Sequence, residues 1–177
     1  ILILGTILPS LSSKSEPVFG CVYKLVAVED KDGNIVPKIK ISENVGKITT
    51  PHFKKLYRFY GRDTGKAIAD YLTVYDETVD DSQNLEIFDP DATWKRKEVY
   101  HFEARELLVP IYQKGKLVYK RPGIEEIKKY CAEQVDTLWD EVKRFDNPHN
   151  YYVDLSQRLY DIKAELLNEK NERYEKN

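Results

Sequence analysis

Methionine is absent from this 177-residue sequence, and cysteine and histidine are scarce. The two cysteines, Cys21 and Cys131, lie far apart and match no metal or redox spacing, so we expect reduced thiols in a cytoplasmic protein. None of the three histidines has a second histidine or a cysteine at metal-ligand spacing, which argues against a zinc site. No apolar run approaches the roughly 20 residues that a bilayer requires, so we expect no membrane span. The missing methionine favours a fragment or a processed product over a complete gene product.

Recognisable catalytic patterns are also missing. The early serines fit no nucleophile elbow, and no pair of carboxylates stands out as an acid and base couple. Gly5-Thr6 is the one local feature suited to a phosphate, because glycine lets an anion approach backbone amides and threonine adds a hydroxyl donor. A plain strand-to-loop turn is several times more common than a phosphate site for a Gly-Thr pair. The residues alone therefore predict no catalytic centre and no metal site in this chain.

What the sequence does contain is a series of hairpin signals, which predict a mainly antiparallel β segment over residues 21–121. Short apolar runs are separated by turns rich in Gly, Asn, Asp and Lys. The expected strand pairs are 22–29 with 35–41, 56–60 with 67–75, and 107–112 with 117–120.

Residues 122–177 change to a helical period. Apolar residues from Ile124 to Phe145 recur at steps of three and four, which predicts an amphipathic helix that Asn147-Pro148 ends. A second helix is expected to begin near Asp154 as its capping residue. The two helices form a predicted helical hairpin, and the fold class is α+β.

Charge is segregated along the chain, although its net value is only −2. Residues 38–66 carry eight Lys or Arg against two Asp or Glu, and residues 70–91 carry eight Asp or Glu and no Lys or Arg. One interpretation is two solvated faces that attract each other. The other is a basic surface for a phosphate-bearing ligand, or, with Tyr57, Phe59 and Tyr60, a face for single-stranded nucleic acid. The acidic stretch and the net charge argue against nucleic acid as a partner.

An ordered set of segments resembles the carboxy-terminal region of nicotinate phosphoribosyltransferases, in the long form shared by many bacteria and animals. The set occurs in the order and at the spacing of that family over nearly the whole chain. It comprises the segments at 15–28, 37–43, 47–54, 104–116, 138–144 and 153–156, together with Arg58.

The resemblance implies an NAD-salvage enzyme that joins nicotinate and phosphoribosyl pyrophosphate with ATP hydrolysis, using Mg²⁺, in a cytoplasmic homodimer. It implies that residues 1–20 supply the closing strand and loop of an α/β barrel whose upstream portion is the partner of this chain. The phosphorylated histidine and the nicotinate-binding arginine of that family lie upstream of the matched region. We therefore expect this chain alone to be inactive. The alternative is a non-catalytic binding or dimerisation module.

Site residues are also carried over by this resemblance. Gly5 and Thr6 fall near the family's phosphoribosyl-binding Gly-x-Gly-Thr turn, but Ile3 stands where the first glycine belongs. Four residues of the lysine-rich segment are expected near substrate phosphates, namely Lys38, Lys40, Ser42 and Lys47. His52 departs from the family, which tends to have glycine after the proline of this loop.

Overall fold

The computed structural model describes residues 24–175 and divides the chain into two compact units. One unit is Lys54–Ser156, and the other combines Ile1–Phe53 with Gln157–Asn177. Small, mostly antiparallel sheets and a few helices give an α+β fold, as the sequence predicts. None of the helices in the described part of the chain has the length and apolar character needed to cross a membrane.

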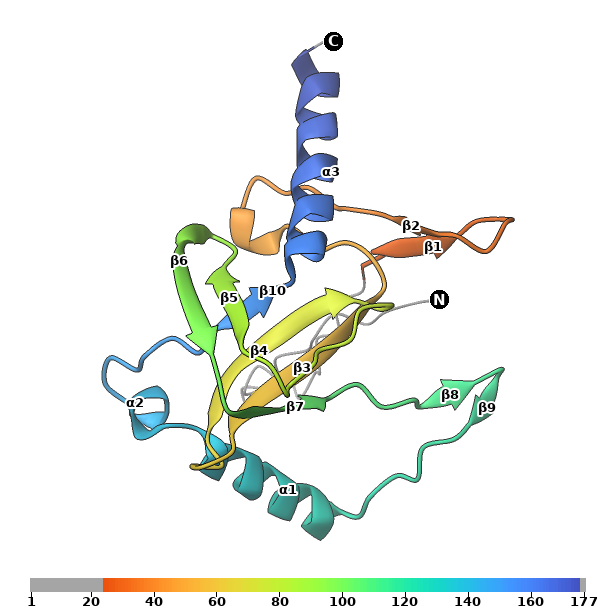
Figure 1. Ribbon diagram of the computed structural model, residues 1–177. Helices are drawn as coiled ribbons and strands as arrows, with labels where there is room; N and C mark the ends of the chain where they lie inside the picture. The colour runs from red at the N-terminus through yellow and green to blue at the C-terminus, as the bar shows by residue number, and fades with distance from the viewer. Residues whose placement is uncertain (1–23, 176–177) are drawn as a thin grey trace, which may run out of the picture. The chain divides into compact units, whose positions relative to one another are not determined.

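A four-stranded sheet lies at the centre of the Lys54–Ser156 unit (Figure 1). The predicted central hairpin is present as β3 (Lys54–Gly61) and β4 (Ala67–Val74), which pair antiparallel. β7 (Phe102–Glu106) adds antiparallel to β3, and β10 (Val153–Leu155) adds parallel to β4. The strand order is therefore β10-β4-β3-β7.

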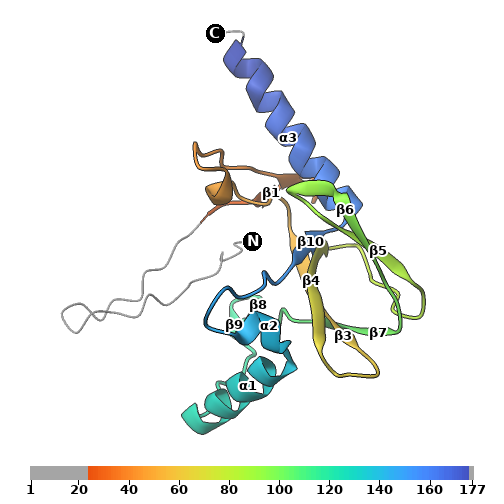
Figure 2. The ribbon, with the colours of Figure 1, turned by 90° about the vertical axis from the view of Figure 1, so that its left-hand side faces the viewer.

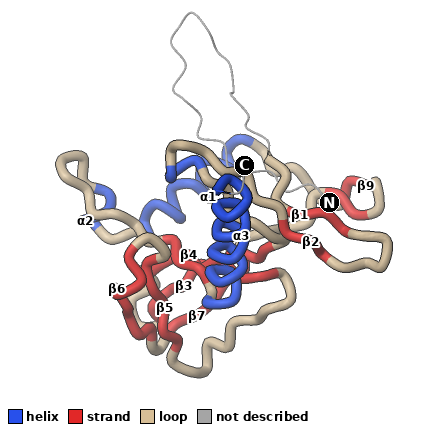
Figure 3. Tube along the Cα trace, turned by 90° about the horizontal axis from the view of Figure 1, so that it is seen from above, coloured by secondary structure: helices blue, strands red, loops and turns tan. Residues whose placement is uncertain are grey.

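The core lies against one face of this sheet. The hairpin of β5 (Leu85–Asp89) and β6 (Ala92–Val99) contributes Ile87 and Val99 to the same buried cluster as Phe59 and Phe102. The rings of Phe59 and Phe102 have centroids 4.7 Å apart, within the range of favourable aromatic pairs. Figure 3 shows β3, β4, β5, β6 and β7 in the same region of the unit. Because side chains alternate across a strand, Arg58 and Asp70 fall on the face opposite Phe59.

The predicted third hairpin is short. β8 (Tyr112–Gln113) and β9 (Lys116–Leu117) pair across Lys114-Gly115, both of which have positive φ. Within the unit, Figure 1 shows this hairpin extending away from the sheet.

The helix predicted from Ile124 to Phe145 is wrong in its extent. It consists of α1 (Ile124–Thr137) and a short α2 (Asp140–Lys143), which follow one another in Figure 2. Leu138 and Trp139 between them have extended backbone. Lys66 Nζ donates to the carbonyl oxygens of Asp136, at 2.7 Å, and Leu138, at 3.4 Å. Lys66 is distant in sequence and provides hydrogen bonds to carbonyls at the end of α1. The spacing of apolar residues within the helix cannot predict such a contact.

The second helix, α3 (Gln157–Glu175), begins after Asp154 rather than at it. Asp154 lies in β10 with only 4% of its surface exposed, so it does not cap the helix as predicted. Val153 and Leu155 instead pair with Asp70 and Leu72 of β4, whose other edge is already occupied by β3. The two helical segments are therefore separated by a strand.

The second unit contains the first predicted hairpin in shortened form, as β1 (Ala27–Glu29) and β2 (Ile35–Pro37). The Asp30 carboxylate closes its turn by accepting from the backbone N–H groups of Asp32 and Asn34. A 3₁₀ turn, η1 (Val45–Lys47), follows and is capped by the Asn44 side chain.

Candidate functional site

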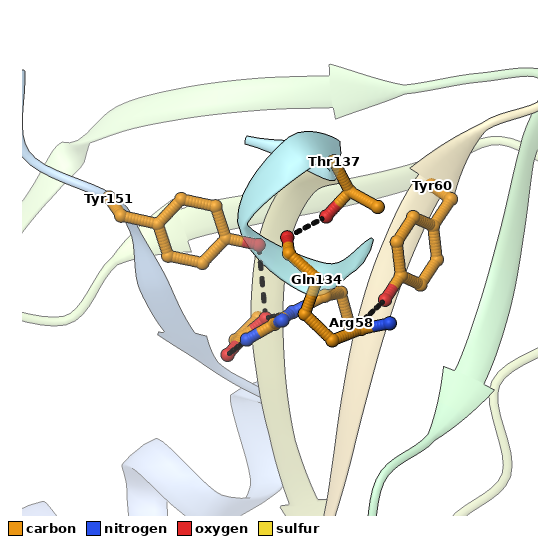
Figure 4. A network of polar contacts seen from close by, with 6 residues as sticks. Arg58, Tyr60, Gln134, Thr137 and Tyr151 are labelled. Atoms are coloured by element: carbon orange, nitrogen blue, oxygen red, sulfur yellow. Dashed lines mark hydrogen bonds and ion pairs between the residues drawn. The ribbon is translucent and has the colours of Figure 1, made fainter. Parts of the chain in front are cut away.

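A polar network of the Lys54–Ser156 unit starts from an ion pair between β3 and β4. Arg58 and Asp70 are direct cross-strand partners in the register of these strands. Arg58 Nε and Nη2 donate to the two carboxylate oxygens of Asp70 at 2.7 and 2.9 Å, a bidentate arrangement. The Tyr151 hydroxyl donates to the same carboxylate at 3.0 Å. Figure 4 marks this bond with a dashed line from the Tyr151 hydroxyl. The chain leading into β10 is thus tied to the sheet.

A second branch ties α1 to the same sheet. The Tyr60 hydroxyl donates to Gln134 Oε1 at 3.0 Å, and these two side chains point toward one another in Figure 4. Thr137, in the last turn of α1, donates its hydroxyl to the Gln134 carbonyl at 2.7 Å. The Arg105 guanidinium lies 4.7 Å from the centroid of the Tyr60 ring, within cation–π range. One polar network therefore connects α1, β3, β4 and the segment before β10.

Two members of this network, Arg58 and Tyr151, have pKa values raised above their ordinary range. The hydrogen bonds to Asp70 raise the pKa of Arg58 above its ordinary value. Burial, followed by the negative charge of Asp70, raises the pKa of Tyr151 well above its ordinary range. Tyr151 is therefore a permanent donor and Arg58 a permanent cation. Arg58 Nε, Arg58 Nη2 and the Tyr151 hydroxyl all donate to Asp70, so these contacts hold β3, β4 and the segment before β10 together.

A cavity of about 560 Å³ adjoins the network within the Lys54–Ser156 unit. Tyr151 contributes to both, and the walls also include Tyr100, Trp139 and Tyr152. His101 and His149 lie at the cavity, and His101 Nε2 is 3.1 Å from Asp63 Oδ1. Aromatic walls with a few polar groups suit a planar ligand or an inserted side chain.

A smaller cavity of about 190 Å³ is lined by residues of opposite charge. Burial, with repulsion from Asp89, raises the pKa of Asp154 to about 6, and Lys97 opposes this shift. Lys95 pairs with Asp89 at 3.8 Å. The sequence predicts Asp154 as a helix cap because Gln157 follows it at capping spacing, and so gives no sign of this buried position in a strand.

The two oppositely charged stretches of the sequence are joined by ion pairs. Besides Arg58 with Asp70, Arg62 lies 3.1 Å from Asp81 across the same stretches. Lys55 Nζ also donates to the Glu77 carbonyl at 3.0 Å. These contacts support the interpretation of mutual attraction and leave less of the basic stretch available for nucleic acid.

The predicted phosphate-binding residues do not join this network. Gly5 and Thr6 lie outside the residues that the structure describes. Lys38, Lys40 and Lys47 are exposed and Ser42 is half-buried, all in the other unit. Two hydrogen bonds hold Lys40 beside Thr49: Lys40 N donates to Thr49 Oγ1 at 3.0 Å, and Thr49 N donates to the Lys40 carbonyl at 3.4 Å. No ion pair involves these three lysines in the part of the chain that the structure describes.

The backbone of His52 explains the departure noted in the sequence. His52 is buried and has φ of 76°, in the left-handed region that favours glycine. The Phe53 backbone N–H donates to His52 Nδ1 at 2.9 Å, so the ring makes a local structural bond. No group of three or more metal-ligating side chains occurs among the described residues.

Known proteins resemble this chain in sequence. A family model described as the nicotinate phosphoribosyltransferase C-terminal domain matches residues 53–163. The nicotinate phosphoribosyltransferase of Bacillus subtilis (strain 168) is 39% identical over 165 residues, which are 93% of this chain and 34% of that protein. The Caenorhabditis elegans protein of the same name is 35% identical over 152 residues, covering 85% of this chain and 26% of that protein.

A solved structure agrees in fold. The crystal structure of human nicotinic acid phosphoribosyltransferase superposes with a TM-score of 0.66 at 24% identity, covering 85% of this chain and 27% of the human chain. The chain thus spans about a third or less of the length of the relatives it matches, and it matches their carboxy-terminal part.

Proposed function

This chain belongs to the nicotinate phosphoribosyltransferase C-terminal domain family, and from that membership we propose that it works as the carboxy-terminal part of an enzyme of NAD salvage. The enzyme would join nicotinate to the phosphoribosyl group of phosphoribosyl pyrophosphate, with release of pyrophosphate and hydrolysis of ATP. The observation that carries the proposal is the family match over residues 53–163, which contains the whole polar network.

In this proposal the chain supports catalysis and does not perform it. The Arg58 network is internally satisfied, and the described residues offer no metal-binding cluster. From the family resemblance, we assign Mg²⁺, ATP, nicotinate binding and the reacting histidine to the amino-terminal portion that the relatives have and this chain does not cover. Assembly as a cytoplasmic homodimer belongs to the same proposal.

A contribution to substrate binding is proposed for the other unit. Lys38, Lys40 and Lys47 carry positive charge that the described residues do not neutralise by ion pairing. Exposed cations of this kind raise the local concentration of a polyanionic substrate. Together with Gly5 and Thr6, they would act on the phosphates of phosphoribosyl pyrophosphate.

The proposal is tested with a chimaera in which this chain replaces the matching carboxy-terminal third of the Bacillus subtilis relative. We expect the chimaera to form nicotinate mononucleotide and the isolated 177-residue chain to form none. Replacing Lys38 and Lys40 by Ala in the chimaera should raise KM for phosphoribosyl pyrophosphate more than it lowers kcat. A folded chimaera without activity, or activity in the isolated chain, would refute the assignment.

A further inference from the structure

One segment of the Lys54–Ser156 unit exposes many large apolar side chains. Every residue from Leu108 to Arg121 is exposed, and this segment, the β8–β9 arm, includes seven large apolar side chains. These are Leu108, Val109, Ile111, Tyr112, Leu117, Val118 and Tyr119. Monomeric soluble proteins rarely expose contiguous apolar patches of more than a few hundred Å².

The arm has little to hold it in place by itself. Its strands are two residues long, and its remaining backbone bonds are local, from Val118 N and Tyr119 N to the Ile111 carbonyl. A two-stranded hairpin is marginally stable in water unless another element packs on it. The short strands of the arm are therefore a second reason, besides its exposed side chains, to expect another element packed against it.

The helix that follows the arm extends the same kind of surface. No residue of α1 is buried, and its apolar stripe of Ile124, Ile127, Cys131 and Val135 is exposed. These positions recur at steps of three and four and so lie on one face of the helix. The arm and this stripe are consecutive in the chain, and both expose apolar side chains.

The charge of the arm restricts what covers it. It carries Lys114, Lys116, Lys120 and Arg121, and no acidic residue occurs between Glu106 and Glu125. A two-fold contact between the arms of two copies would place like charges opposite one another, which is unfavourable. The partner is therefore expected to offer apolar positions bordered by carboxylates.

From these observations we propose that the β8–β9 arm and the α1 stripe are the docking surface for the amino-terminal portion of the nicotinate phosphoribosyltransferase polypeptide. This inference rests on the proposed function. The relatives devote only 26–34% of their length to the part matched by this chain, so a larger body accompanies the domain in each of them. An apolar surface of this extent is what such a body is expected to cover.

Cys131 provides a direct probe because it is an exposed thiol on the proposed surface. Its alkylation by iodoacetamide is followed by mass spectrometry of its peptide, in the dilute isolated chain and in the Bacillus subtilis chimaera. We expect alkylation to be slower by about tenfold or more in the chimaera, since thiol reactivity follows access. Amide hydrogen exchange across 54–104 confirms that the unit is folded in both samples.

Two matched variants identify the surface. Leu117→Asp places a charge on the arm, and Trp94→Asp places one on an apolar residue of β6 outside it that is even more exposed, at 78% against 60%. Leu117→Asp should return the alkylation rate in the chimaera toward that of the isolated chain, and Trp94→Asp should not. If Cys131 reacts equally fast in an active chimaera, the docking proposal is wrong while the enzymatic function stands.

The remaining outcomes are also decisive. Alkylation that slows in the isolated chain as its concentration rises would show that a second copy covers the surface, contrary to the proposal. A protected Cys131 in a folded but inactive chimaera would keep the docking proposal and refute the proposed activity.

Discussion

The Asp70 carboxylate is expected to be the most sensitive polar position of the Lys54–Ser156 unit. It accepts two hydrogen bonds from Arg58 and one from Tyr151, with only 11% of its side chain exposed. Asp70→Asn keeps the shape but removes the charge and turns one acceptor into a donor. The Arg58 side chain, 21% exposed, would then face an amide N–H with no compensating charge.

The magnitude follows from the burial of the pair. Removing one partner of a buried ion pair costs about 3–5 kcal/mol, and the residual exposure of Arg58 places this case near about 3 kcal/mol. Trp94 and Trp139 both lie in this unit, so their fluorescence during urea unfolding reports on it. With a slope of about 2 kcal/mol/M, the urea midpoint should fall by about 1.5 M.

A control on the same unit separates this effect from a general loss of charge. Glu86 pairs with Arg96 between β5 and β6, and both side chains are about half exposed, at 57% and 48%. Glu86→Gln should cost less than about 1 kcal/mol because solvent screens an exposed pair. If Asp70→Asn costs no more than Glu86→Gln, the network does not hold the segment before β10 as inferred here.

Two further predictions concern Asp154 and His52. Burial raises the pKa of Asp154 to about 6, from about 4 in the unfolded chain. The contribution of the protonated carboxyl to stability is therefore complete below about pH 4 and is lost as pH rises through 6. Asp154→Asn should therefore flatten the fall in the free energy of unfolding between about pH 4 and 6, measured by urea titration at several pH values; equal slopes in both proteins would contradict this. The backbone of His52 has φ of 76°, and its ring accepts a hydrogen bond from Phe53 N. Both His52→Gly and His52→Ala lose that bond, but only glycine relieves the backbone strain. The glycine variant should therefore be about 1 kcal/mol more stable than the alanine variant. Equal urea midpoints for the two variants would count against backbone strain at this position.

Local sequence signals predicted those elements whose stabilising contacts are also local. The β3–β4 hairpin follows from two apolar runs around a turn with glycine, and the arm follows from Lys114-Gly115. β6 was missed because four consecutive charged residues, from Lys95 to Glu98, are typical of a solvated loop. They are exposed on a strand whose ends, Ala92 and Val99, are buried.

The candidate site was beyond local reasoning for the same physical reason. Arg58 was noted only as part of a resemblance, because its partner Asp70 is 12 residues away and Tyr151 a further 81. The interruption between α1 and α2 depends on Lys66, which is 70 residues from the carbonyl it contacts at Asp136. A periodic pattern describes one face of one element and carries no information on such distant donors.

The contrast between paired polar side chains and exposed apolar side chains bears on the role of this domain. A catalytic domain keeps polar side chains available for a substrate and covers its apolar ones. In the Lys54–Ser156 unit, Arg58 and Tyr151 both donate to the Asp70 carboxylate, whereas Leu117 on the arm and Ile124 on α1 remain 60% and 68% exposed. Burial of this exposed apolar area against a partner would be favourable. Under the proposed function, that partner is the amino-terminal portion of the enzyme, which this domain would help to position.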